Sequence, residues 1–186
     1  MTSPAAARGR EVRQRLLAAA AELIPERGWT AVSTRILAER AGVTPSVVHY
    51  HFPSLQALLR EAVVSLMRQI LTGMDTFLDD ASTPADAVDA MLASANQYSG
   101  DDPMSLLFVE AYLASTRDEQ LRAEIGGLVE GFRQRFGDWL RAQGVPAAEP
   151  TASVVGACVD GLLLHRGLGA GPDMKDVAAV VRRLVT

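Results

Sequence analysis

The stretch from Ser33 to Phe52, STRILAERAGVTPSVVHYHF, decides the fold. It predicts two short helices that cross at a tight turn, with Gly42 between them. Gly42 suits this turn because it adopts a positive φ without the steric cost of a Cβ. Ala38 is small where the helices touch, and Val48 is β-branched where the second helix faces the first. This spacing is typical of a helix-turn-helix, although ordinary helical hairpins also contain it.

The second of these helices carries short polar side chains near its N-terminus. That end of a recognition helix enters the major groove of DNA, and the helix dipole there favours phosphate. We therefore expect DNA contacts from this surface, from the start of the first helix and from an arginine that precedes both. The expected DNA-binding residues are Arg10, Ser33, Thr34, Arg35, Thr44, Pro45, Ser46, Val47, His49, Tyr50 and His51.

On either side of this stretch, apolar positions recur at helical spacing and no segment alternates as a strand would. The pattern predicts an all-α chain of about nine helices. Residues 1–53 are expected to form a three-helix, helix-turn-helix DNA-binding domain, and 54–186 a helical bundle for effector binding and dimerisation. The short Ala- and Arg-rich start is expected to be disordered.

The charge of the chain is distributed unevenly. Residues 1–60 hold eight arginines and four glutamates, a net charge of +4, whereas the rest holds ten basic and eighteen acidic side chains, a net charge of −8. A basic head on an acidic body suits a protein whose head binds a polyanion. Chance clustering on solvated helix faces is the alternative.

The sequence also predicts a cytoplasmic protein. Its single cysteine, Cys158, allows no internal disulfide and suits a reducing compartment. No secretory signal is visible near the start. The most apolar run, 154–164, is interrupted by Asp160 and is too short to span a bilayer.

Two segments in the N-terminal part of the chain resemble the TetR family of bacterial repressors. They are RQRLLAAAAELIPERGW at 13–29 and ILAERAGVTPSVVHYHFPSLQALL at 36–59. The family's Ala-Gly-Val-Ser turn corresponds to 41–44, and its His/Tyr-Phe pair to His51 and Phe52. FVEAYLASTRDEQLRAEI at 108–125 is similar to later family helices. The resemblance implies a homodimer that reads a near-palindromic operator and is released when an effector binds.

The chain departs from the family pattern at two positions where the family's usual residues contact DNA phosphates. The usual recognition-helix tyrosine falls at His49, and the usual lysine at the start of the fourth helix falls at Leu55. The resemblance therefore implies a different phosphate anchor, for which His49, Tyr50, Arg35 and the N-terminal arginines are the candidates.

An effector pocket is expected in the C-terminal part, where methionines and a few polar side chains share apolar helix faces. Methionine adapts to irregular shapes and suits an apolar ligand, although ordinary core filling explains any single one. Glu110 would anchor a cationic or donor-rich effector, or else serve as a hydrogen-bond partner for a neighbouring helix. The expected pocket residues are Met67, Ile70, Met74, Met91, Asn96, Tyr98, Met104 and Glu110.

The last two expected helices, about 150–168 and 174–185, are apolar on more than one side. A helix of this kind must be covered on more than one side, and a second copy of the chain is a natural cover near the chain end. Intramolecular burial is the alternative. The sequence thus predicts a homodimer through these two helices.

No catalytic or metal-binding constellation is expected. His49 and His51 point in nearly opposite directions on a helix, and Cys158 with His165 gives only two ligands. The sequence therefore predicts no enzyme and no cofactor other than a small-molecule effector. A helical enzyme or ligand carrier, an architectural DNA-binding protein without effector, and a transcriptional activator remain as alternatives.

Overall fold

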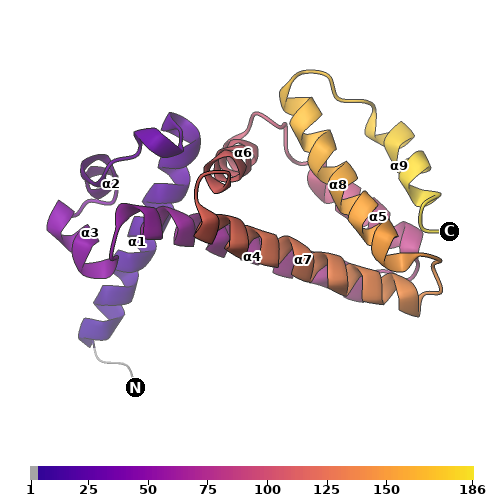
Figure 1. Cartoon of the computed structure of the whole chain (residues 1–186), viewed down its shortest axis with the longest axis horizontal. Helices are drawn as coiled ribbons and strands as arrows, with labels where there is room; N and C mark the ends of the chain where they lie inside the picture. The colour runs from indigo at the N-terminus through magenta and orange to yellow at the C-terminus, as the bar shows by residue number, and fades with distance from the viewer. Residues whose placement is uncertain (1–3) are drawn as a thin grey trace. The chain divides into compact units, whose positions relative to one another are not determined.

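The computed structural model describes residues 4–186, without the side chains of Ala5 and Asp75. Over this range the chain forms nine α-helices, one 3₁₀ helix and no strand, which confirms the all-α prediction. In chain order (Figure 1) the elements are α1 (Pro4–Arg27), η1 (Trp29–Ala31), α2 (Thr34–Arg40), α3 (Pro45–His51), α4 (Leu55–Asp80), α5 (Pro84–Ala95), α6 (Pro103–Ser115), α7 (Glu119–Ala142), α8 (Ala148–Gly167) and α9 (Met174–Arg182).

The expected disorder at the start of the chain is wrong from Pro4 onward. α1 already begins there and runs to Arg27 without a break, in a segment rich in alanine and arginine, both good helix formers. The first three residues, for which the same expectation was made, lie outside the described part of the chain.

The helices form two compact units that do not follow chain order. The first unit contains the chain up to Leu66 together with Leu106–Arg122, and the second contains Met67–Ser105 and Ala123–Thr186. Helices α4, α6 and α7 therefore each contribute residues to both units.

The core of the first unit is made mostly of leucines. Its buried side chains include Leu16, Leu23, Ile24, Leu37, Val48, Leu58, Leu59, Leu107 and Leu121. Gly28 ends α1 with a φ of 85°, and the next residue, Trp29, is buried. The indole Nε1 of Trp29 donates a hydrogen bond to Oε1 of Gln56 at 3.0 Å, which ties the end of α1 to the start of α4.

The α2–α3 pair has the geometry that the sequence predicts. The Ser33 hydroxyl caps α2 by accepting a hydrogen bond from the backbone N–H of Ile36 at 3.3 Å. Gly42 has a φ of 66° at the turn, and the N–H of Val43 returns to the carbonyl of Ala38 at 2.9 Å. Ala38 and Val48 are both buried, so the helix-turn-helix prediction is confirmed.

In the second unit, α5 packs against both α8 and α9. The shared core contains Met91 from α5, Phe136 and Leu140 from α7, Val155 from α8 and Val181 from α9. The N-termini of α5 and α9 are capped by side chains: Thr83 accepts from the N–H of Asp86, and Asp173 accepts from the N–H of Lys175. The packing of this unit is therefore specified at both the core and the helix ends.

The loop after α5 lies directly against the end of α8. A Cβ placed on Gly100, whose φ is +89°, would lie only 2.3 Å from the backbone nitrogen of Gly167. Beside this contact, Arg166 donates to the carbonyl of Tyr98 at 2.7 Å and to the side-chain oxygen of Asn96 at 3.0 Å. A glycine on each side permits an approach that no other residue would allow.

Candidate DNA interface and ligand pocket

The outer face of α3 is polar and open to solvent. Val48 points into the core, whereas Tyr50 has 84% of its surface exposed. The remaining predicted contact residues on this segment are exposed or half-buried; they are Thr44, Pro45, Ser46, Val47, His49 and His51. Pro45 occupies the first turn of α3, where its missing N–H costs no hydrogen bond. This face is accessible to a macromolecule over its whole length.

Arg13 of α1 holds the end of α3 in place, and sequence analysis did not single it out. Its guanidinium donates to the backbone carbonyl of His51 at 2.8 Å and to the carboxylate of Glu61. The same group lies 4.1 Å from the centre of the Phe52 ring, in a cation–π contact. Its partners are 38 and 48 residues away in the sequence, so no local pattern could have indicated this role.

A second arginine, Arg40, joins α2 to α1. It donates to Glu22 at 3.1 Å and to both carboxylate oxygens of Glu26. The hydrogen bond from Arg40 lowers the pKa of Glu26, and its bonds to these two carboxylates raise the pKa of Arg40 itself. Because Glu22 and Glu26 neutralise its charge, Arg40 is a weak candidate for binding DNA phosphate. Arg10 and Arg35, which the sequence predicted as contacts, are exposed.

Glu110 of α6 belongs to the first unit, and its carboxylate is used within the fold. It accepts a hydrogen bond from the backbone N–H of Trp29 at 2.7 Å. A Cβ on Gly28 would lie 3.7 Å from both carboxylate oxygens, in ordinary van der Waals contact, so glycine is favoured there by its φ of +85° and not by lack of space. The structure therefore favours the hydrogen-bond interpretation of Glu110 over the effector-anchor interpretation.

A second link within this unit joins α4 to the start of α7. Arg60 donates to the Asp118 carboxylate at 3.1 Å, and the same carboxylate caps α7 by accepting from the N–H of Leu121 at 2.9 Å. The bond from Leu121 lowers the pKa of Asp118, and Arg60 lowers it further, against the opposing effect of burial. Asp118 is therefore held as a carboxylate.

None of the other predicted pocket residues lines the cavity between α4 and α7 that is described below. Met91 is buried in the core of the second unit, and Asn96 is exposed with its side-chain oxygen bound to Arg166. Met67, Ile70, Met74, Tyr98 and Met104 are half-buried. Methionine at helical spacing marks core as readily as it marks a cavity, and Met91 and Met74 contribute to core packing.

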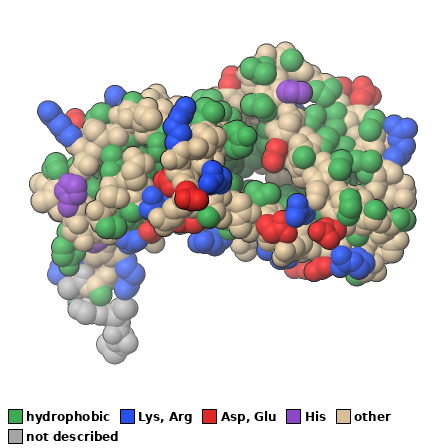
Figure 2. All heavy atoms as spheres, in the orientation of Figure 1, with side chains coloured by type: hydrophobic (Ala, Val, Ile, Leu, Met, Phe, Trp, Pro, Cys, Tyr) green, Lys and Arg blue, Asp and Glu red, His purple; other side chains and the backbone are tan. Residues whose placement is uncertain are grey.

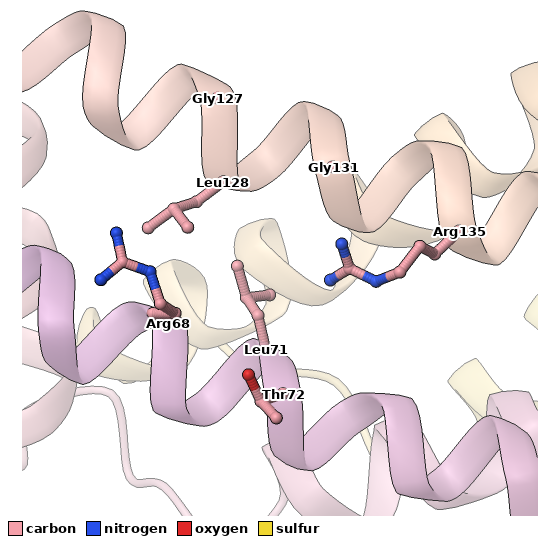
Figure 3. A pocket seen from close by; sticks show the side chains of 7 residues that line it. All are labelled: Arg68, Leu71, Thr72, Gly127, Leu128, Gly131 and Arg135. Atoms are coloured by element: carbon pink, nitrogen blue, oxygen red, sulfur yellow. The ribbon is translucent and has the colours of Figure 1, made fainter.

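A cavity of about 300 Å³ instead lies between α4 and α7 in the second unit (Figure 3). Its walls are Arg68, Leu71, Thr72, Gly127, Leu128, Gly131 and Arg135. Sequence reasoning missed it, although the close glycines of α7 are a signal, because a helix that lacks side chains on one face leaves space beside a neighbour. The cavity is large enough to hold a small organic molecule.

Residues 4–186 contain neither a metal-binding cluster nor a membrane-spanning helix. No group of three or more histidine, cysteine, aspartate or glutamate side chains there could hold a metal ion. No helix in the described part of the chain is both long enough and apolar enough to cross a membrane.

These features together define a class. A helix-turn-helix with an open polar second helix, followed by a larger helical region with a cavity, is the organisation of a DNA-binding transcriptional regulator that carries a separate sensor region. Family comparison narrows this class: residues 16–62 match the model of bacterial regulatory proteins of the tetR family, and residues 82–186 match the tetracyclin repressor-like C-terminal domain. The chain belongs to the TetR family of transcriptional regulators.

Individual relatives agree with this assignment. The chain is 26% identical to the HTH-type transcriptional regulator BetI of Brucella melitensis biotype 2 over 178 residues, which cover 91% of this chain and 87% of BetI. It is 30% identical to a transcriptional regulator of known structure from Streptomyces coelicolor A3(2), with a TM-score of 0.76 and coverage of 95% and 99% of the two chains. A regulator from Saccharomonospora viridis, solved in complex with choline, shares the fold at 20% identity and a TM-score of 0.75, with coverage of 95% of this chain and 96% of that one.

Proposed function

We propose that this regulator represses transcription by binding operator DNA as a homodimer, and that a small-molecule effector releases it. The observation that carries the proposal is the exposed polar face of α3, anchored through Arg13 to α1 and α4. An anchored recognition helix can present its side chains to base edges without first being ordered, which lowers the cost of binding.

In this proposal, DNA binding and effector binding belong to successive segments of the chain. Residues 1–53 would bind DNA, with the contact residues that the sequence predicted, and residues 54–186 would bind the effector and dimerise. The family matches support this division, since they separate an N-terminal regulatory domain from a C-terminal one. We also propose a cytoplasmic location, because bacterial operator DNA lies in that compartment.

An apolar stripe on α8 supports the dimer. Its members recur at alternating spacings of four and three residues, the pattern of a helix that packs lengthwise on another. They are Pro150, Val154, Ala157, Gly161 and Leu164, and Leu168 continues the spacing just after the helix ends. Val154 and Leu164 are each about half exposed, as is Val180 on α9. Figure 2 shows hydrophobic side chains on the visible surface over α8 and α9. Packing of the same stripe from a second copy of the chain would remove these apolar side chains from water.

Release would follow from differential binding. Two recognition helices must lie roughly 34 Å apart to enter successive major grooves on one face of DNA. An effector that binds about 100-fold more tightly to a dimer with another spacing would oppose operator binding by about 2.7 kcal/mol. The choline complex of the Saccharomonospora viridis protein supports the idea that this fold accepts a small molecule.

The test begins with selection of tight-binding duplexes from a random library, followed by fluorescence anisotropy with the selected sequence. A variant with Thr44, Ser46, His49 and Tyr50 replaced by alanine should fold normally, because all four side chains are exposed. Its affinity for the selected duplex should fall at least about tenfold. Alanine at Glu119 and Arg122, also exposed, is the matched control and should bind like the parent.

Three results would redirect the proposal. Unchanged affinity in the α3 variant would remove α3 as the recognition helix. Salt-dependent binding without sequence preference would favour an architectural DNA-binding protein. A reporter gene that is switched on rather than off by the regulator would make it an activator.

A further inference from the structure

Two arginines from different helices face the cavity between α4 and α7. Arg68 extends from α4 and Arg135 from α7, and their guanidiniums lie in the space between the two helices (Figure 3). Guanidinium groups in general are cations that pair well with anions. Arg135 also takes part in an interaction within the chain, but a guanidinium has five N–H donors and can serve two partners.

The glycines of α7 keep the space in front of these guanidiniums open. A Cβ on Gly127 would meet no atom within 4 Å, so a ligand atom could occupy that space. A Cβ on Gly131 would lie 3.2 Å from Nη1 of Arg135, so a larger residue there would push the guanidinium aside. Small residues at both positions therefore preserve the cavity and the placement of one of its charges.

The rest of the lining is mainly apolar. Leu71 and Leu128 project between the two arginines, and Thr72 adds one hydroxyl (Figure 3). A cation would be repelled by two guanidiniums, and an uncharged hydrocarbon would leave them without a ligand partner. A carboxylate on a hydrocarbon chain matches both parts, because guanidinium pairs geometrically with carboxylate and leucine packs on methylenes.

We propose that this cavity binds an amphipathic carboxylate, which pairs with the Arg68 guanidinium and packs its hydrocarbon against Leu71 and Leu128, while Arg135 adds a second positive charge to the site. This inference rests on the proposed function, since it assigns the chemical class of the effector. It also separates this chain from its choline-bound structural neighbour, whose ligand carries the opposite charge.

The test is calorimetric titration of the full-length protein with octanoate. Comparison ligands are octyltrimethylammonium, which has the same chain and the opposite charge, choline, and inorganic phosphate, which is an anion without a hydrocarbon. Octanoate should bind at least about tenfold more tightly than each of them. Equal or tighter binding of either cation would overturn the proposal, and equal binding of phosphate would show a simple anion site instead.

Variants locate the site. Arg68→Gln removes the charge and keeps a shorter polar side chain, and it should weaken octanoate binding about tenfold, a modest factor because the guanidinium also reaches solvent. Gly127→Leu should weaken binding by filling the space while leaving both charges in place. Arg141→Gln removes a charge from the same helix outside the cavity and should bind octanoate like the parent. Unchanged affinity in both cavity variants would overturn the assignment.

DNA binding distinguishes the failure of this inference from the failure of the proposed function. If the selected duplex binds but octanoate does not, the ligand class is wrong and the regulator proposal stands. If octanoate binds at the cavity but no duplex is selected, the site stands and the DNA-binding proposal fails. If both bind, octanoate should weaken duplex binding in the parent and not in Arg68→Gln.

Discussion

The contact between Gly100 and Gly167 allows a sharp prediction for Gly100→Ala. A Cβ at Gly100 would lie 2.3 Å from the nitrogen and 2.8 Å from the Cα of Gly167, and 2.5 Å from the carbonyl oxygen of Leu163. All three are backbone atoms, so no side-chain rotation can relieve the overlap. The loop after α5 or the end of α8 would have to move.

Two costs add at this position. Placing alanine at a φ of +89° costs about 1–2 kcal/mol, because a Cβ disfavours left-handed backbone. Forcing packed backbone segments apart costs about 1–3 kcal/mol more. We therefore expect Gly100→Ala to lower the free energy of unfolding by about 2–5 kcal/mol, a large share of the stability of an ordinary domain.

Urea unfolding followed by far-UV circular dichroism measures this loss, with all variants at one protein concentration because a dimer's stability depends on it. Gly126→Ala is the matched control: a Cβ there meets no atom within 4 Å inside α7, and alanine in a helix should stabilise by about 0.5–1 kcal/mol. A loss below about 0.5 kcal/mol for Gly100→Ala would refute the claim that this approach requires glycine.

Asp118→Asn should lower the free energy of unfolding by about 1–2 kcal/mol at neutral pH through a weaker cap and a lost ion pair with Arg60. Because the folded-state pKa of Asp118 is lowered, this stabilisation is present above its ordinary pKa of 3.8 and is lost as the pH falls through the lower folded-state value. The free energies of unfolding of parent and variant, measured by urea titration at several pH values, should therefore converge in acid. Leu164→Glu on the α8 stripe should shift the protein from dimer to monomer in light scattering, whereas Leu106→Glu on α6 should not, and dimers in both would exclude the stripe. Glu110→Gln should cost about 1 kcal/mol and leave octanoate affinity unchanged, whereas a clear loss of octanoate binding would restore Glu110 as an effector anchor.

Local chemistry allowed the helix-turn-helix to be predicted. The roles of Ala38, Gly42 and Val48 depend on neighbours within ten residues, and Ser33 caps the helix that begins beside it. Composition and helical periodicity likewise sufficed for the all-α class, because each helix carries its own apolar face and end signals.

The parts that could not be predicted depend on distant partners. Arg13 acts through His51 and Glu61, and nothing near it in the sequence distinguishes it from the other N-terminal arginines. Glu110 was expected to face inward, but its partner, the N–H of Trp29, is 81 residues away. The cavity depends on which face of α7 lies opposite α4, a relation that the period of either helix alone leaves open.

The sharing of α6 and α7 between the two compact units has a consequence for engineering. Leu107, Ala111 and Leu121 are buried in the first unit, together with the helix-turn-helix. A truncation that removes only the N-terminal head would strip the cover from these side chains, and the remaining fragment should aggregate. A hybrid regulator that takes its DNA-binding head from another family member would therefore need the segment corresponding to residues 106–122 from the same protein. The exchanged part would then consist of two separate segments of the gene.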